Sequence, residues 1–214
     1  MKIIHRITLA AASLCLAITS AYALEGDATA GQQAAAVCAA CHQPNGAGMN
    51  IQGGESWPKL AALDATYLHK QLHDIKAGTR QSPTMMPFVS MLNEQQLKDV
   101  SVYYSQLPAI QGQFDAAATE EELAHGEKLA MEGDWDRYIV PCMKCHGPDN
   151  LGVGEAFPKL AGQHAGYIAD QLHAWQTGKR DNDPQHLMVA IAERMNDKDI
   201  RAVSQWLSRQ PAQR

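Results

Sequence analysis

The chain has 214 residues and a formal charge of −5, from 18 Lys and Arg against 23 Asp and Glu. That length allows one large domain or two small ones. The acidic balance argues against nucleic acid and anionic lipid surfaces as partners, and it favours a soluble protein that docks on other proteins through complementary charge.

Residues 1–23 have the three parts of a secretory signal peptide. A basic stretch at residues 2–6 precedes an apolar segment from Ile7 to Ile18, which is short for a membrane-spanning helix. Ala21-Tyr22-Ala23 then forms a small-x-small cleavage site, so we expect the mature chain to begin at Leu24. The alternative is an uncleaved anchor. Cleavage removes two basic residues and no acidic one, which leaves a charge of −7.

A C-x-x-C-H motif occurs at residues 38–42 and again at residues 142–146. This spacing is typical of c-type haem attachment, because two thiols form thioethers with one porphyrin and the adjacent His is held beneath the iron. A lone C-x-x-C could be a redox dithiol or half of a zinc site, but neither requires the His. The sequence therefore predicts two covalently bound haem c groups. The predicted attachment residues are Cys38, Cys41, Cys142 and Cys145, and the predicted proximal ligands are His42 and His146.

The two motifs belong to a longer internal repeat. Trp57-Pro58-Lys59-Leu60-Ala61 matches Phe157-Pro158-Lys159-Leu160-Ala161 at an offset of 100, and the offset then becomes 103, where residues 97–101 match residues 200–204. The chain is therefore a duplication with small insertions. Further pairs at offset 100 join Tyr67, Gln71, Leu72, His73, Gly78 and Arg80 to Tyr167, Gln171, Leu172, His173, Gly178 and Arg180.

The duplication predicts two haem domains, at residues 24–112 and 122–214, after a signal peptide at 1–23. Residues 113–121 form the predicted linker, within a polar, Ala-rich stretch. Domains of this size are small for an independent core, but a covalently held haem gives the helices a large apolar body on which to pack.

Each half is predicted to be helical, with no alternating strand pattern of useful length. An Ala-rich helix from Ala28 to Ala40 leads into the first haem motif, and a second helix from Asp64 to Ala77 stops at Gly78. The last helix of each half is predicted to begin at a capping box. The two boxes pair Asn93 with Gln96 and Asn196 with Asp199.

The sixth coordination position of each iron decides between electron transfer and chemistry on a substrate. Met85 and Met188 are the only Met residues that pair at the offset of 103, and both lie in polar loops that contain Pro. A single Met is more often core filling, but this matched pair predicts that both bind iron. The competing candidates are Met86 and His186.

The remaining His residues are interpreted as polar-face or haem-edge side chains. His73 and His173 match each other but fall inside a predicted helix. Pro58 and Pro158 follow the haem motifs, and their carbonyls are predicted to accept hydrogen bonds from the proximal His rings, because a ligating His normally donates its second N–H. A simple turn proline is the alternative. The other candidate ligands were His69, His125 and His164.

Nearly all of the predicted mature chain resembles the cytochrome c4 family of diheme class I cytochromes c. The resemblance implies two tandem all-α cytochrome c domains, related by a pseudo-twofold axis, with the haem propionates near the interface and His/Met ligation of both irons. The first half departs by four extra residues between His42 and Pro58, which predicts a longer surface loop at residues 47–54. The residues that carry the resemblance are the two haem motifs, Trp57-Pro58-Lys59-Leu60, Lys70 to Gly78, Pro83-Thr84-Met85, Phe157 to His164 and Met188.

The resemblance also implies the function. The family carries electrons in the periplasm, often from a quinol-oxidising cytochrome bc complex towards a terminal oxidase, so we expect such redox proteins as partners. The expected protein is not an enzyme and is a monomer, soluble or peripheral at the membrane. The alternative is a diheme subunit of a periplasmic dehydrogenase, such as a flavocytochrome sulfide dehydrogenase. A diheme peroxidase or a thiosulfate dehydrogenase would need an open or unusual sixth position.

Overall fold

The computed structural model describes residues 24–213, so the predicted signal peptide at residues 1–23 lies outside the described part of the chain. The described residues form an all-α structure, as predicted, in which the β-type pairings are isolated bridges. Among these residues, no helix combines the length and the hydropathy that crossing a membrane requires.

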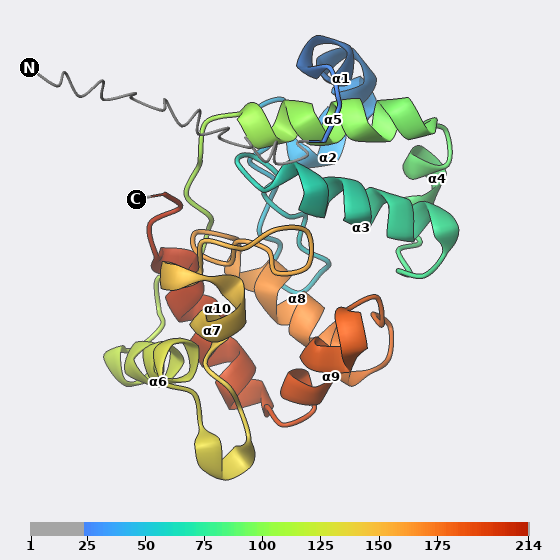
Figure 1. The fold of residues 1–214 in the computed structure, drawn as a ribbon. Helices are drawn as coiled ribbons and strands as arrows, with labels where there is room; N and C mark the ends of the chain where they lie inside the picture. Colours follow the sequence, from blue (N-terminus) through green and yellow to red (C-terminus); the bar gives the residue numbers. More distant parts are fainter. Residues whose placement is uncertain (1–23, 214) are drawn as a thin grey trace, which may run out of the picture.

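The helices form two halves that stack on each other (Figure 1). The first half contains α1 (Ala28–Ala34), α2 (Ala39–His42), α3 (Ala65–Ala77), α4 (Met86–Val89) and α5 (Glu94–Gln106). The second half contains α6 (Glu120–Met131), α7 (Cys142–His146), α8 (Ala165–Gln176), α9 (Leu187–Ala192) and α10 (Asp197–Arg209). Each helix of the first half has a counterpart in the second, so the repeat in the sequence is also a repeat of the fold.

Local signals set the ends of the predicted helices. The carboxylate of Asp64 accepts hydrogen bonds from two amides in the first turn of α3, and the helix ends at Gly78, which has a φ of 79°. The helices α5 and α10 both begin at the predicted capping boxes, with each reciprocal pair of hydrogen bonds present. These boundaries are therefore confirmed.

The continuous helix predicted from Ala28 to Ala40 is wrong in one respect. The chain forms α1, then a 3₁₀ turn at Ala35–Val37, and then the short helix α2. Before this break α1 packs on α5, and after it Cys38, directly before α2, and Cys41 within α2 line a cavity. Ala-rich composition predicts helix but cannot locate such a bend.

The first and last helices of each half meet at a glycine. A Cβ atom on Gly31 would lie 2.1 Å from the carbonyl oxygen of Asp99, and one on Gly126 would lie 2.2 Å from the carbonyl oxygen of Ala202. The two backbones can approach this closely only because no side chain separates them. The same contact therefore fixes α1 on α5 and α6 on α10.

Each half encloses its own apolar core. The core of the first half contains Leu92 and Leu97, and that of the second contains Met195 and Ile200, all of them buried. These residues flank the capping boxes at the starts of α5 and α10, at the two positions where an apolar pair fixes the entry of a helix.

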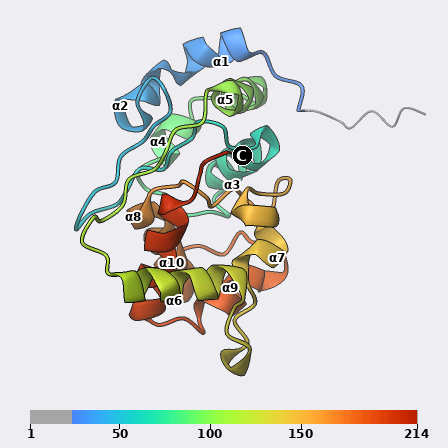
Figure 2. The ribbon, with the colours of Figure 1, turned by 90° about the vertical axis from the view of Figure 1, so that its left-hand side faces the viewer.

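The second half carries a hairpin between α6 and α7, for which the first half has no equivalent (Figure 2). Asp134 and Ile139 exchange two backbone hydrogen bonds of 2.8 Å across its base. Arg137 in the turn donates to Asp134 and to Asp199, both at 2.7 Å. The hairpin is therefore tied to the start of α10.

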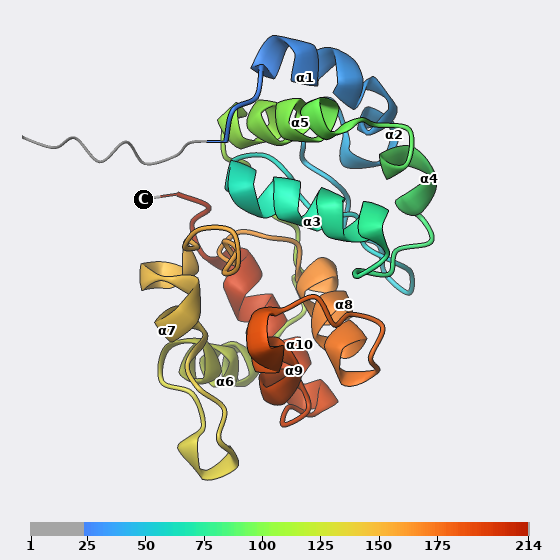
Figure 3. The ribbon, with the colours of Figure 1, turned by 45° about the vertical axis from the view of Figure 1, so that its right-hand side comes forward.

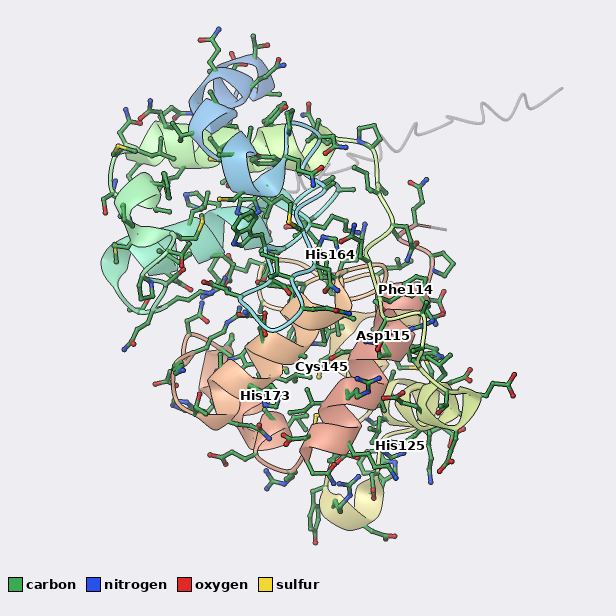
Figure 4. The ribbon with its side chains drawn as sticks, turned by 180° about the vertical axis from the view of Figure 1, so that it is seen from behind. Phe114, Asp115, His125, Cys145, His164 and His173 are labelled. Atoms are coloured by element: carbon green, nitrogen blue, oxygen red, sulfur yellow. The ribbon has the colours of Figure 1, made fainter. Side chains whose placement is uncertain are left out.

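The connection between the halves, residues 107–119, runs along the second half (Figure 4). The amide of Gly112 donates to the carbonyl of Gly162 at 2.8 Å. Further along, the guanidinium of Arg209 in α10 lies 4.1 Å from the centre of the Phe114 ring. These contacts hold the connection against the second half.

The longer loop predicted in the first half is present. An antiparallel bridge closes it between Met49 and Trp57, whereas the equivalent bridge in the second half joins Val153 to Phe157. The extra length reaches the second half, because the amide of Ser56 donates to the carboxylate of Asp170 in α8 at 2.9 Å. The insertion therefore helps to hold the two halves together.

Candidate functional site

The helix α2 carries the first haem motif. Cys38 and Cys41 are half-buried, and His42 is buried at 5% exposure. The Nδ1 atom of His42 lies 2.9 Å from the carbonyl oxygen of Pro58, so the proton is on Nδ1 and that atom donates. Burial lowers the pKa of His42 against the opposing effect of this carbonyl. The ring is therefore neutral, and its Nε2 lone pair is available to a metal.

The helix α7 carries the second motif in the same arrangement. Cys142 is half-buried and Cys145 is exposed. The Nδ1 atom of His146 donates to the carbonyl of Pro158 at 2.8 Å, and burial lowers the pKa of this ring too. Its Nε2 is buried and has no hydrogen-bond partner among the described residues. Because His146 also lines the cavity described below, this acceptor is placed where it can bind a metal.

The predicted carbonyl acceptors are therefore present in both halves. Pro58 and Pro158 do not merely turn the chain, because each fixes the tautomer and the orientation of one proximal His ring.

One cavity of about 360 Å³ extends through both halves, and most of its lining residues are apolar. Two methionines contribute to it: Met85 directly precedes α4, and Met188 lies in the first turn of α9, so the loop expected around Met188 is helical there. The structure therefore brings every predicted site residue to the same cavity. Those residues are Cys38, Cys41, His42, Met85, Cys142, Cys145, His146 and Met188.

The competing candidates lie elsewhere. Met86 does not line the cavity, and its sulfur accepts a hydrogen bond from the hydroxyl of Ser90 at 3.4 Å. His186 is exposed and is paired with Asp181 at 2.9 Å.

The other His side chains have partners or positions away from the cavity. His164 is fully engaged, because its Nε2 donates to the carbonyl of Ala47 at 2.7 Å and its Nδ1 accepts from the amide of Gln113 at 2.8 Å. His73 is largely exposed, and His173 pairs with a glutamine one turn later (Figure 4). The interpretation of this matched pair as polar-face residues agrees with these positions.

Buried side chains join the two halves beside the cavity, where α3 and α8 lie on either side of the interface (Figure 3). The side-chain amide of Gln163 accepts from the amide of Lys59 at 2.9 Å and donates to its carbonyl at 2.8 Å. The Nζ of Lys159 donates to the carbonyl of Ala62 at 2.9 Å. The P-K-L-A segments of the internal repeat therefore also contribute to the interface, which their sequence did not indicate.

A second interface cluster has no predicted role, although its members stood out as matched pairs in the repeat. Gln71 in α3 and Gln171 in α8 both accept hydrogen bonds from Arg80 and from Arg180. All four side chains line the cavity. The offset of 100 was the available signal, but it could not show that the pairs meet in space.

These sites suit covalently bound haem. The apolar cavity fits a flat apolar macrocycle, the cysteines and both proximal His residues lie at its wall, and His146 has a buried Nε2 without a partner among the described residues. A tandem pair of such sites in an all-α fold defines a diheme c-type cytochrome.

Comparison with known proteins gives the family. The family model for cytochrome c matches residues 28–108 and 123–210. The cytochrome c4 of Pseudomonas aeruginosa is 37% identical over 91% of this chain and 94% of its own length. The chain therefore belongs to the cytochrome c family, in its diheme cytochrome c4 group, and carries two covalent haem c groups.

Two further comparisons describe its relatives. The crystal structure of reduced cytochrome c4 from Pseudomonas stutzeri superposes with a TM-score of 0.78 at 37% identity, over 87% of this chain and all of that one. The thiosulfate dehydrogenase electron acceptor of Stutzerimonas stutzeri is 41% identical over 82% of this chain and 79% of its own length. Both similarities are to electron-transfer cytochromes.

Proposed function

We propose that this diheme electron carrier binds one iron through His42 and Met85 and the other through His146 and Met188. The observation that supports this most is the shared cavity, which is lined by all four residues and by the four motif cysteines. The two hydrogen bonds from Nδ1 to a proline carbonyl support the His ligands independently. The haem supplies one-electron chemistry, and the chain supplies its ligands and surroundings.

The chain's own residues suit electron transfer better than catalysis on a substrate. The carbonyls of Pro58 and Pro158 hold the proximal rings in one orientation, so little rearrangement accompanies a change of iron charge. The apolar lining excludes water, and a Met ligand favours the ferrous state. With Met85 and Met188 bound, neither iron keeps an open position for a substrate, so the proposed protein is not an enzyme.

The proposed location is the periplasm, and the proposed oligomeric state is a monomer. The signal peptide predicted at residues 1–23 supports export, and haem is attached to these motifs outside the cytoplasm. The acidic surface supports docking on basic patches of redox partners. The first candidate route runs from a cytochrome bc complex to a terminal oxidase.

A second candidate route begins at a periplasmic dehydrogenase, the class of donor predicted as the alternative. The observation that favours it is the 41% identity to a thiosulfate dehydrogenase electron acceptor. On this route the donor oxidises an inorganic sulfur compound and passes electrons singly to the haems.

Stopped-flow reduction of the ferric holoprotein distinguishes the routes. The protein is mixed either with a thiosulfate dehydrogenase and thiosulfate or with a cytochrome bc complex and quinol, and the ferrous haem absorbance is followed. Faster reduction by the dehydrogenase would support the second route, and faster reduction by the bc complex the first. Thiosulfate alone is the control. Turnover with thiosulfate alone would contradict the proposal that the protein is not an enzyme.

A further inference from the structure

Two arginines meet at the centre of the interface. Arg80 and Arg180 are paired by the repeat and form an antiparallel backbone bridge with each other. Arg180 is only 6% exposed, and its guanidinium lies 4.3 Å from the centre of the Trp175 ring. The fold therefore brings a half-buried and a buried cationic side chain together, where like charges repel more strongly than in water.

The hydrogen bonds of this pair cross between the halves. Arg80 donates to Gln71 of its own half at 2.9 Å and to Gln171 of the other half at 2.9 Å. Arg180 donates to Gln171 at 2.8 Å and to Gln71 at 2.9 Å. Each guanidinium is therefore held by both halves, and Arg80 gains a third contact with the hydroxyl of Tyr167 at 3.1 Å.

These acceptors are all neutral. Among the described residues, neither guanidinium has a carboxylate within the 4.0 Å of an ion pair, because the nearby Asp74 is paired with Lys70 and accepts from Asn182 at 2.6 Å. Burial, and then the charge of Arg80, lowers the pKa of Arg180. A buried cation beside a half-buried one, with no anion between them, is unfavourable, so an anion outside the protein chain is expected to complete the cluster.

The cavity is where that anion would lie. Both arginines line it, together with the haem-attaching cysteines of both halves. A haem brings two carboxylates, and guanidinium groups bind carboxylates through paired, charge-assisted hydrogen bonds. We propose that Arg80 and Arg180 form one clamp, shared by both halves, that binds the haem carboxylates and raises both reduction potentials. This inference rests on the haem sites proposed above.

The crossed bonds give the clamp a specific consequence. A positive charge favours ferrous over ferric iron, and each arginine is held at the boundary between the two sites, so loss of either charge should lower both potentials. We expect Arg80→Gln and Arg180→Gln each to weaken the reduction equilibrium of both haems by about threefold or more, which is roughly 30 mV at 59 mV per tenfold change. The haem carboxylates would also bind protons more readily, so both potentials should fall more steeply as pH rises.

The test is a potentiometric titration of the holoprotein and its variants at several pH values, with haem content measured by intact mass. Arg201→Gln is the matched control, because Arg201 is exposed and pairs with Asp115 and Glu122 away from the cavity; its potentials should stay close to those of the parent. Arg80→Lys keeps the charge but not the planar fork, so both potentials should fall less than in Arg80→Gln.

The outcomes separate the proposals. A fall in only one potential would overturn the shared clamp, and no fall in either would overturn the clamp entirely. Equal falls in the Lys and Gln variants would overturn the role of charge, and Arg180→Gln supplies the charge-free comparison if Arg80→Gln does not fold. A parent protein with fewer than two haems would instead contradict the proposed haem sites.

Discussion

Met85 and Met86 are adjacent in the chain, yet their sulfur atoms have different surroundings. Met85 lines the cavity, whereas the sulfur of Met86 is hydrogen-bonded to Ser90 one turn later in α4. The repeat predicted this choice through spacing alone, because Met85 stands as far from Leu97 as Met188 does from Ile200. The position of Met85 supports its proposed role as the ligand.

Separate replacement of the two residues by Leu tests the assignment at roughly constant volume. In Met85→Leu the charge-transfer absorption from Met sulfur to ferric iron should fall by about half, because the second haem still contributes. Met86→Leu is the matched control and should leave the band nearly unchanged. The assignment would be wrong if Met86→Leu lost the band, and loss in neither variant would point to a His ligand in the first half.

At the scale of helices, the sequence predicted the helix ends that are set by residues close to them in the chain. Each of these helix ends depends on residues within one turn, so the sequence pattern alone predicts it. The examples are the capping boxes at Asn93 and Asn196 and the stop at Gly78. The bend after Ala34 and the glycine contacts between helices depend on distant backbone, and composition does not encode them.

Asp199 shows how one residue can serve several elements. It completes the capping box of α10, and it also accepts from Arg137 of the hairpin and pairs with His125 of α6, both at 2.7 Å. Burial alone would raise the pKa of Asp199, but the hydrogen bonds from Arg137, the Asn196 amide and His125 lower it to about 2. The ionised carboxylate therefore stabilises the second half.

The change Asp199→Asn tests this junction. The lowered pKa implies that the ion contributes stability above the unfolded-state pKa of about 4 and loses it as pH falls towards 2. The free energy of unfolding should therefore drop by about 2 kcal/mol at pH 7, and the difference from the parent should shrink between pH 4 and 2. Denaturant unfolding of the holoprotein at both ends of this range measures it.

The matched control is Asp197→Asn, which removes an exposed charge from the same first turn of α10. It should change the free energy of unfolding by no more than about 0.5 kcal/mol. An equal loss in the two variants would attribute the effect to the helix dipole and not to the junction.

For the whole molecule, the duplication predicted two similar halves but not how they meet. The hydrogen bond from His42 to the carbonyl of Pro58 could be predicted from the sequence because both residues belong to one half. The crossed contacts of Arg80 with Gln171, and of Gln163 with Lys59, require the relative position of two folded halves. A repeat gives no information about that position, so the interface had to be found in the structure.

The central claim is that the protein holds two haems, each with His and Met as axial ligands. Low-temperature electron paramagnetic resonance of the ferric holoprotein, with spins counted against haem content, tests it most directly. Because Met85 and Met188 would fill both sixth positions, the account predicts only low-spin signals that integrate to two irons per chain. A high-spin signal from either haem at neutral pH would contradict it.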